Sequence, residues 1–286
     1  MILIADSGST LTDWCLLNAD KTINKYFKTA GLNANYLTEF EIYDVLLSEF
    51  KINLPYPILE KITNVYFYGS GCSTKQKQEK IKTQILKLTP NADVIADHDT
   101  LGAAISLCGN NKGIACILGT GSNSCFYDGE NIKKTILSLG YLLGDEGSGT
   151  HIGKKILYCY LKNKMPQEIK ELFYEKYKKQ PEDIIIEMYS VGKVGAYFAA
   201  FSYFAAENLN FPYIQNIVKE CFRDFLQEQV ALFDEAKFLP ISFVGSIASV
   251  FHIELKTVLC EFGYTLGKII KNPIYGLVEF HQKNRN

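Results

Sequence analysis

Hydrophobic residues recur along the chain in short uncharged runs, and several of these runs end in glycine, serine or threonine. Residues 1–5 lead into a turn at 6–10, and residues 113–118 lead into a turn at 119–122. Such runs are typical of strands covered on both faces, and the glycines at 119 and 121 can adopt positive φ without penalty in a tight turn. One such turn is typical of an ordinary hairpin, whereas two in the same chain favour a functional role that both turns share.

The first half of the chain alternates strand and helix patterns. Runs at 13–18 and 22–29 predict a three-stranded meander with the first strand. Thr38 and Glu41 form a capping box, and the hydrophobic residues at helical spacing behind it predict a helix. These hydrophobic residues are Phe40, Tyr43, Leu47 and Phe50. The further elements predicted here are a strand at 65–68, a small turn at 69–71, a helix at 73–88, a strand at 93–97 and a helix at 101–108.

The second half begins by repeating the meander. Its predicted strands lie at 114–118, 124–127 and 132–136, its helices near 151–163, 166–178, 193–208 and 212–234, and its last strand at 241–244. A further helix follows the turn at 245–246. We therefore predict an α/β protein of two domains, 1–110 and 111–286, with extra helices in the second and a last helix that can pack back on the first. Turns at the carboxyl ends of strands would line a cleft between them.

Composition and charge exclude several classes of protein. The 30 basic and 31 acidic residues give a formal charge of −1, so no bulk field favours nucleic acid or an anionic membrane. The longest uncharged stretch, 238–253, falls short of the roughly 20 residues of a membrane-spanning helix. Eight cysteines without a C-x-x-C pair predict reduced thiols in a cytoplasmic protein. The five lysines of the 73–88 helix oppose an apolar side, which favours a solvated face over a nucleic-acid patch.

The glycine turns are candidate phosphate sites, because consecutive backbone N–H groups that point the same way bind anions. The hydroxyls of Thr120 and Ser122 add two donors. Neither G-x-x-x-x-G-K-[S/T] nor a G-x-G-x-x-G after a strand is present, so the sequence disfavours a P-loop or Rossmann protein. Three turns from distant segments, at 6–10, 119–122 and 245–246, suit a nucleotide held between two domains.

Phosphoryl transfer also needs a Mg²⁺ partner and a carboxylate near the attacking hydroxyl. Asp6 ends the first strand and is the candidate partner of Mg²⁺, through bound water. Asp99 follows a strand and precedes a helix, so it is the candidate base, with Asp97 as its competitor. Both aspartates also suit helix capping or a turn.

Four motifs in register resemble the N-acetylglucosamine kinase and BadF/BadG/BcrA/BcrD ATPase family. They are Asp6-Ser-Gly-Ser-Thr10 with Asp13-Trp14, Gly119-Thr-Gly-Ser-Asn123, Gly144-Asp-Glu-Gly-Ser148 and Val244-Gly-Ser246. The resemblance runs over the whole chain and is strongest to small bacterial proteins described as putative N-acetylglucosamine kinases. It implies the actin, Hsp70 and sugar-kinase superfold, in which duplicated ribonuclease H-like domains surround a nucleotide cleft.

The resemblance also implies the site residue by residue. The base falls on Asp99, in Asp99-Thr-Leu-Gly-Ala103, a pattern that Asp97 does not fit. ATP contacts fall on Ser7, Gly8, Ser9, Thr10, Gly119, Thr120, Gly121, Gly245 and Ser246. Amino-sugar contacts fall on Asn35, Ser70, Gly71, Asp99, Thr120, Ser138, Leu139, Gly140 and Asp145. Animal members have a tryptophan where Leu139 stands and glycines where Ser7 and Ser9 stand.

The implied activity is that of an ATP-dependent amino-sugar kinase, with Mg²⁺, acting on a hydroxyl of N-acetylglucosamine that the resemblance places at position 6. The alternatives are an N-acetylmuramic acid kinase, an ATP-driven switch that activates a partner protein, and a non-catalytic sugar sensor. A kinase needs a second polar pocket, and residues 144–149 with Asn35 favour it for that reason. The expected partners are small molecules and not nucleic acid or membrane. The sequence does not decide whether the protein forms a homodimer.

Overall fold

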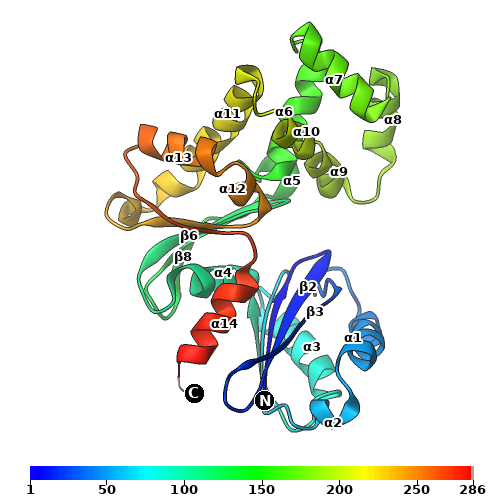
Figure 1. Cartoon of the computed structure of the whole chain (residues 1–286), viewed down its shortest axis with the longest axis vertical. Helices are drawn as coiled ribbons and strands as arrows, with labels where there is room; N and C mark the ends of the chain where they lie inside the picture. The colour runs from blue at the N-terminus through cyan, green and yellow to red at the C-terminus, as the bar shows by residue number, and fades with distance from the viewer. Residues whose placement is uncertain (285–286) are drawn as a thin grey trace. The chain divides into compact units, whose positions relative to one another are not determined.

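Figure 1 shows the computed structural model, which describes residues 1–284. The chain divides into two compact units. Unit 1 contains Met1–Asn111, Gly129–Ile132 and the C-terminal residues from Asn272 on, and unit 2 contains Lys112–Asp128 and Lys133–Lys271. Each unit has its own hydrophobic core.

Unit 1 is a five-stranded sheet with helices, in the strand order β3-β2-β1-β4-β5. Its strands are β1 (Ile2–Ser7), β2 (Leu11–Leu17), β3 (Ile23–Ala30), β4 (Asn64–Gly69) and β5 (Asp93–His98). Its helices are α1 (Glu39–Asn53), α2 (Tyr56–Leu59), α3 (Lys75–Leu86), α4 (Asp99–Cys108) and α14 (Pro273–Lys283). The first three strands form an antiparallel meander, and β4 and β5 run parallel to β1.

Unit 2 repeats this plan, with the strand order β10-β9-β6-β7-β8. Its strands are β6 (Gly113–Leu118), β7 (Ser122–Tyr127), β8 (Ile132–Thr135), β9 (Ile241–Val244) and β10 (Leu266–Ile270). Its helices are α5 (Gly140–Leu143), α6 (Gly149–Leu161), α7 (Gln167–Tyr177), α8 (Pro181–Ser190), α9 (Val194–Ala200), α10 (Ser202–Glu207), α11 (Pro212–Glu228), α12 (Ser246–Val250) and α13 (His252–Glu261), with 3₁₀ helices η1 (Val230–Leu232) and η2 (Asp234–Lys237). The shared strand order confirms the predicted duplication of an α/β unit, with extra helices in the second copy.

The capping box and the helix predicted here are confirmed in α1, and the residues that the helix buries are only in part those whose spacing predicted it. Thr38 accepts from the backbone N–H of Glu41, whose carboxylate accepts from the backbone N–H of Thr38. The buried residues are Ile42, Leu46 and Phe50, whereas Phe40 is 76% exposed. Both sets keep helical spacing, so the pattern alone did not decide which stripe faces the sheet.

Helix α14 packs on unit 1, against α4 and β1. The buried His281 ring stacks on Tyr66, 3.9 Å between centroids, and its Nε2 lies 3.1 Å from the Tyr68 hydroxyl. Burial lowers the pKa of His281 to about 4. Lys21 donates to the carbonyls of His281 (3.2 Å) and Asn284 (2.6 Å), so a cation satisfies the last turn of the helix.

The strand predicted as the last one, 241–244, is followed by β10, which the sequence pattern did not indicate. β10 contains a glycine and a lysine in five residues and is only half-buried at the edge of its sheet. Gly267 lies so close to β9 that a Cβ there would be 2.2 Å from the Ser242 hydroxyl, and Lys268 N–H donates to that hydroxyl. The parallel pairing of β10 with β9 shifts at an irregularity between Leu266 and Ile269, so the short strand lacks the hydrophobic alternation on which strand prediction depends.

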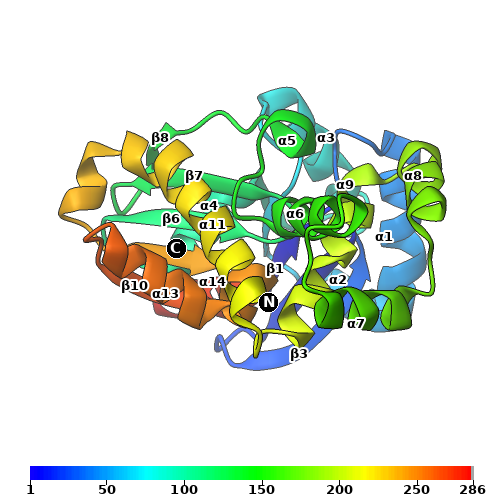
Figure 2. The same cartoon turned by 90° about the horizontal axis from the view of Figure 1, so that it is seen from above.

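Three helix predictions in unit 2 need correction. The helix predicted at 212–234 ends at Glu228, and η1 and η2 follow it. The single helix predicted at 193–208 is two helices, α9 and α10, because Ser202 donates its hydroxyl to the carbonyl of Ala199 at the break. Helix α8 was not predicted; it begins at Pro181, which suits a first helical position. Figure 2 shows α6 beside α9, against which it packs.

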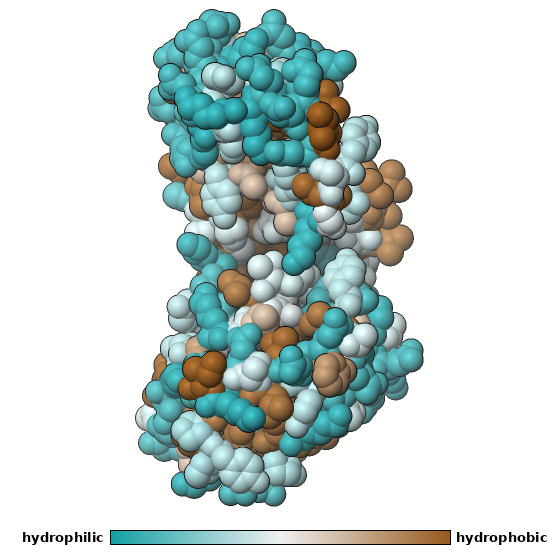
Figure 3. All heavy atoms as spheres, turned by 90° about the vertical axis from the view of Figure 1, so that its right-hand side faces the viewer, coloured by the Kyte–Doolittle hydropathy of each residue, from teal (hydrophilic) through white to brown (hydrophobic). Residues whose placement is uncertain are grey.

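The surface carries mostly polar side chains with scattered hydrophobic ones. On the face seen in Figure 3, teal polar atoms predominate and brown hydrophobic atoms appear in small groups. Among residues 1–284, no helix combines the length and the hydropathy that crossing a bilayer requires. All eight cysteines are free thiols, and five of them are buried.

Candidate active site

Three parallel strands of unit 1 end in the same row. Ser7 of β1 is paired with Gly69 of β4, which is paired with His98 of β5. The residues that follow these strand ends therefore share one edge of the sheet. They include most of the unit 1 residues that the sequence predicted, namely Ser7, Gly8, Ser9, Thr10, Ser70, Gly71 and Asp99.

Asp99 is the first residue of α4, and its carboxylate is held by hydroxyls. Ser70 Oγ donates to Asp99 Oδ2 at 2.7 Å, and Thr100 Oγ1 donates to Oδ1 at 3.3 Å. The helix is capped by His98, whose Nδ1 accepts from the N–H of Leu101 at 3.1 Å. The alternative in which Asp99 serves as the cap is therefore wrong, and its carboxylate is left for another role.

Asp97 is engaged differently. Its Oδ1 accepts from the backbone N–H of His98 at 2.8 Å and from Nε2 of Gln78 at 3.3 Å. These contacts tie the carboxylate to the turn between β5 and α4 and to α3. The carboxylate of Asp97 thus stabilises the local backbone and α3, which is the structural role expected of it if Asp99 is the base.

Asp6 lies among carboxylates. Burial, followed by the negative charges of Asp99 and Asp13, raises the pKa of Asp6 to about 7. Asp13 stands opposite Asp6 on β2 and pairs with Lys28 at 2.9 Å. This excess of negative charge fits a cation. Within the described residues, no three His, Cys, Asp or Glu side chains are grouped as metal ligands.

We expect the raised pKa of Asp6 to give the protein a measurable pH dependence. Asp6 stays protonated in the folded state between about pH 4 and 7, where the unfolded chain has lost the proton, so its contribution to stability is lost as pH rises through this window. His151 and His281 act in the opposite direction, because burial lowers the pKa of each to about 4. The contribution of Asp6 is therefore isolated by comparing the melting temperatures of the wild type and a variant at position 6.

Asp6→Asn should therefore melt above the wild-type protein by a margin that is small at about pH 5 and grows to several degrees at about pH 8. At the higher pH, Mg²⁺ with a nucleotide should stabilise the wild type and so reduce the difference in melting temperature between the two proteins. Melting curves at both pH values measure this effect. An equal difference at the two values would contradict the assignment of a raised pKa to Asp6.

The loop at 31–35 lies on the 6–10 turn and engages its side chains. Ser7 Oγ accepts from Leu32 N–H at 3.1 Å, and Ser9 Oγ accepts from Asn33 Nδ2 at 2.7 Å. The two hydroxyls expected at a phosphate are thus already bonded within unit 1. Because Ser9 Oγ accepts its bond, its hydroxyl hydrogen can still be donated to a phosphate at this turn, beside the backbone N–H groups.

Asn35 is held by a residue that the sequence did not single out. The ammonium of Lys77, on α3, donates to Asn35 Oδ1, and Lys80 donates to the carbonyls of Ala34 and Leu37. The fully solvated lysine face predicted for α3 is therefore wrong at these two positions. With its oxygen engaged, Asn35 has its Nδ2 donors left for a ligand.

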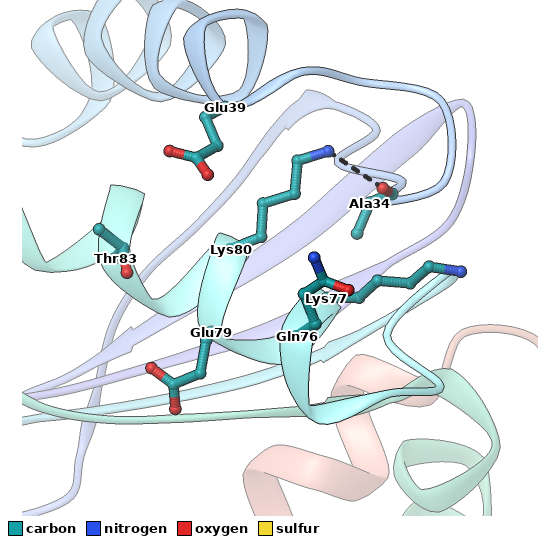
Figure 4. A pocket seen from close by; sticks show the side chains of 7 residues that line it. All are labelled: Ala34, Glu39, Gln76, Lys77, Glu79, Lys80 and Thr83. Carbon is teal, nitrogen blue, oxygen red and sulfur yellow. Dashed lines mark hydrogen bonds between the residues drawn. The ribbon is translucent and has the colours of Figure 1, made fainter.

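A hollow of about 380 Å³ lies beside this loop, and Figure 4 shows the side chains that line it. Its walls come from the 31–35 loop, the start of α1 and α3. The lining residues are Ala34, Glu39, Gln76, Lys77, Glu79, Lys80 and Thr83. Lys80 reaches from α3 to Ala34 across its rim in Figure 4, so the hollow borders the loop that carries Asn35.

In unit 2 the 119–122 turn is fastened to the start of α6. The N–H groups of Gly149 and Thr150 donate to the carbonyls of Gly119 (2.8 Å) and Thr120 (3.1 Å), and the Thr150 hydroxyl donates to Thr120 at 2.6 Å. Gly119 N–H donates to Gly121 within the turn. Among the described residues, the N–H groups of Thr120 and Gly121 donate to no protein acceptor. These are the donors left for an anion.

The glycine that the backbone requires is Gly245 and not the two of the 119–122 turn. Neither Gly119 nor Gly121 has positive φ, so the turn does not use the conformational freedom that these two glycines have. Gly245 has φ +123°, and a Cβ there would lie 2.2 Å from the carbonyl oxygen of Leu118. The turn that ends β9 is thus pressed against the end of β6.

A pocket of about 170 Å³ opens beside these two turns, wholly within unit 2. One end is formed by Gly119, Thr120 and Ser246, and the walls are small or apolar. The remaining lining residues are Gly149, Ala196, Ala199, Ala200, Ser202, Tyr203, Ala206, Ile247, Val250 and Phe251. The uncharged run of small and aromatic residues at 195–206 is the sequence feature that could have indicated the walls of this pocket.

Asp145 stands at the same turn. Its Oδ1 accepts from Ser122 N–H at 3.1 Å, and a Cβ on Gly121 would lie 2.9 Å from that oxygen. Asp145 has φ +60°, a conformation that aspartate tolerates better than most residues, and burial raises its pKa. Ser138 and Leu139 lie in an exposed stretch before α5, and Gly140 follows them with φ +66°.

Comparison with solved structures finds several similar proteins. A putative N-acetylglucosamine kinase from Porphyromonas gingivalis is 39% identical, with 99% of each chain covered and a TM-score of 0.93. A putative N-acetylglucosamine kinase from Chromobacterium violaceum is 17% identical, with 98% of each chain covered and a TM-score of 0.75. A ROK family glucokinase from Streptomyces griseus, solved with glucose and AMPPNP, is 12% identical over 98% of this chain and 97% of that one, with a TM-score of 0.60.

The similarity to the last two proteins is one of fold. No protein-family model and no curated protein matches the chain.

Proposed function

Because this chain belongs to the N-acetylglucosamine kinase family of the actin, Hsp70 and sugar-kinase superfold, and is therefore a sugar-kinase-type phosphotransferase, we propose that its acceptor is N-acetylglucosamine. ATP donates its γ-phosphoryl group, and the attacking group is the 6-hydroxyl. We further propose that the enzyme acts in the cytoplasm on small molecules.

The observation that carries the proposal is the position of Asp99. It follows one of three parallel strands that end in the same row, and its Oδ2 is fixed by Ser70. Oδ1 accepts only the longer bond from Thr100 and is the better placed oxygen to take the proton of a sugar hydroxyl. In this proposal Asn35, Ser70 and Gly71 orient the sugar.

Unit 1 also supplies the partner for Mg²⁺, which would neutralise charge on the transferring phosphoryl group. Asp6 suits this role because burial, and then the charges of Asp99 and Asp13, raise its pKa, and a bound dication would stabilise its charged form. The donors at the 6–10 turn are expected to meet phosphate oxygens.

For unit 2 we propose the nucleotide site. The N–H groups of Thr120 and Gly121 suit a phosphate, and the pocket that begins at Gly119, Thr120 and Ser246 has apolar walls that suit adenine. Asp145, with Ser138, Leu139 and Gly140 from the stretch before it, is assigned to the amino sugar.

N-acetylmuramic acid is the alternative acceptor, and one observation favours it. The ammonium of Lys77 stands at Asn35, a proposed sugar contact, and would attract the carboxylate that distinguishes this sugar from N-acetylglucosamine.

A panel of amino sugars with Mg-ATP tests the proposal, with ADP release and the phosphorylated product as readouts. N-acetylglucosamine should accelerate ADP release and yield the 6-phosphate, whereas hydrolysis without sugar should be slow. ADP release that no sugar accelerates would instead support an ATP-driven switch. A faster reaction with N-acetylmuramic acid would identify the alternative acceptor.

A further inference from the structure

We propose that Asn33 is a positioning residue that couples the 6–10 turn to the 31–35 loop, so that nucleotide and amino sugar bind with positive cooperativity. The proposal rests on the proposed function, because it takes the turn as a phosphate contact and Asn35 as a sugar contact. Asn33 itself reaches neither ligand in this scheme. It acts through the two segments that do.

The side-chain amide of Asn33 bridges the two segments. Its Nδ2 donates to Ser9 Oγ at 2.7 Å, and its Oδ1 accepts from the backbone N–H of Asn35 at 2.9 Å. The residue is 6% exposed, so water competes weakly for these bonds. One planar group thus fixes the distance between a proposed phosphate contact and a proposed sugar contact.

Close packing of the backbones makes the bridge stiff. Gly31 N–H donates to the carbonyl of Thr10 at 2.9 Å, and Leu32 N–H donates to Ser7 Oγ at 3.1 Å. A Cβ on Gly31 would lie 2.5 Å from Gly8 O, so the loop and the turn have no space between them. Neither segment can shift by a fraction of an ångström without moving the other.

A third segment connects Asn33 to the proposed base. A Cβ on Gly71 would lie 2.3 Å from Asn33 Oδ1, so the turn after β4 packs directly on the amide. The neighbouring Ser70 donates to Asp99 Oδ2 at 2.7 Å. The 6–10 turn, the 31–35 loop and the turn after β4 therefore all contact the buried side chain of Asn33.

Shared ordering gives the cooperativity. A phosphate bound at the 6–10 turn would restrict Ser9, and through Asn33 it would restrict the backbone of Asn35. A sugar that binds next has less conformational entropy to lose, and thermodynamic linkage makes the effect mutual. Couplings of this kind are typically roughly 5- to 150-fold in affinity.

The experiment is calorimetric titration of the full-length protein with N-acetylglucosamine, with and without saturating Mg-AMPPNP. The wild type should bind the sugar at least about fivefold more tightly when the analogue is present. Asn33→Ala removes both bonds and should bring this ratio close to one. Ser9→Ala removes only the bond from Nδ2 and should reduce the ratio while the protein keeps the Asn35 contact.

Asn33→Asp is the conservative variant. A carboxylate can accept from Asn35 N–H with one oxygen and from the Ser9 hydroxyl, acting as donor, with the other. This variant should keep the ratio while its negative charge weakens the binding of the analogue itself. Gln84→Ala is the matched control, because Gln84 is a fully buried amide of unit 1 that bonds Glu39 and Lys87 away from this network, and it should leave the ratio unchanged.

The outcomes separate this inference from the proposed function. If the wild type binds neither ligand, both fail. If it binds both ligands without cooperativity, or if folded Asn33→Ala keeps the wild-type ratio, the coupling role is overturned and the kinase proposal stands. If Asn33→Ala does not fold, Ser9→Ala and Asn33→Asp decide: an unchanged ratio in Ser9→Ala or a lost ratio in Asn33→Asp overturns the inference.

Discussion

Asp99→Asn should lower kcat by about 10²- to 10⁴-fold, the usual contribution of a positioned general base. The amide keeps the size of the carboxylate and one oxygen that can accept from Ser70, so sugar and ATP should still bind. The melting temperature should change little, because His98 and not Asp99 caps α4. Steady-state kinetics with calorimetry of both ligands would separate turnover from binding.

Asp97→Asn is the matched control, two residues away on the same strand end. Its Oδ1 accepts from His98 N–H and from Gln78, and an amide oxygen can accept both bonds, so the variant should lose at most about 1 kcal/mol of stability and keep most of its turnover. Near-normal kcat in Asp99→Asn would end the assignment of the base. If Asp97→Asn alone abolished turnover, the roles of the two aspartates would have to be exchanged.

Gly245→Ala should both destabilise the protein and weaken nucleotide binding. The backbone at φ +123° is one that residues with a Cβ rarely adopt, at a cost of about 1–3 kcal/mol. The new Cβ would also lie 2.2 Å from the Leu118 carbonyl, so β9 and β6 must separate where the 119–122 turn begins. We expect a fall of several degrees in melting temperature and at least about a tenfold loss of ATP affinity.

Gly263→Ala is the control for strain without collision. Gly263 also lies in unit 2 and has φ +72°, but nothing stands within 4 Å of a Cβ built there. This variant should lose only about 1 kcal/mol and bind ATP normally. Equal effects of the two substitutions on ATP affinity would show that the contact of Gly245 with Leu118 does not shape the nucleotide site.

The duplicated sheets could be predicted because their signals are local. An uncharged run such as 113–118 that ends in glycine indicates a buried strand, and the three-strand spacing occurs twice along the chain. The capping box of Thr38 and Glu41 is equally local. β10 lacks such a signal, since its five residues include a glycine and a lysine and its pairing with β9 shifts at an irregularity.

The candidate site divides in the same way. Asp6 and Asp99 could be chosen because each comes directly after or at the end of a predicted strand, where parallel sheets gather their ligands. Asn33 could not be chosen, although it lies in a turn that the sequence marks clearly. Its importance comes from burial between Ser9 and Gly71, and only the folded chain brings those residues to it.

The docking of α14 on unit 1 has a consequence for the order in which the chain can fold during synthesis. Most of unit 1 precedes unit 2 in the chain, yet Tyr66 and Tyr68 can contact their partner, His281, only after unit 2 has been synthesised. Unit 2 lies between these segments in the chain and is complete at Lys271. Unit 1 therefore begins before unit 2 in the chain and is completed after it. A fragment ending at Asn111 would leave Tyr66 and Tyr68, which contact His281 of α14, uncovered.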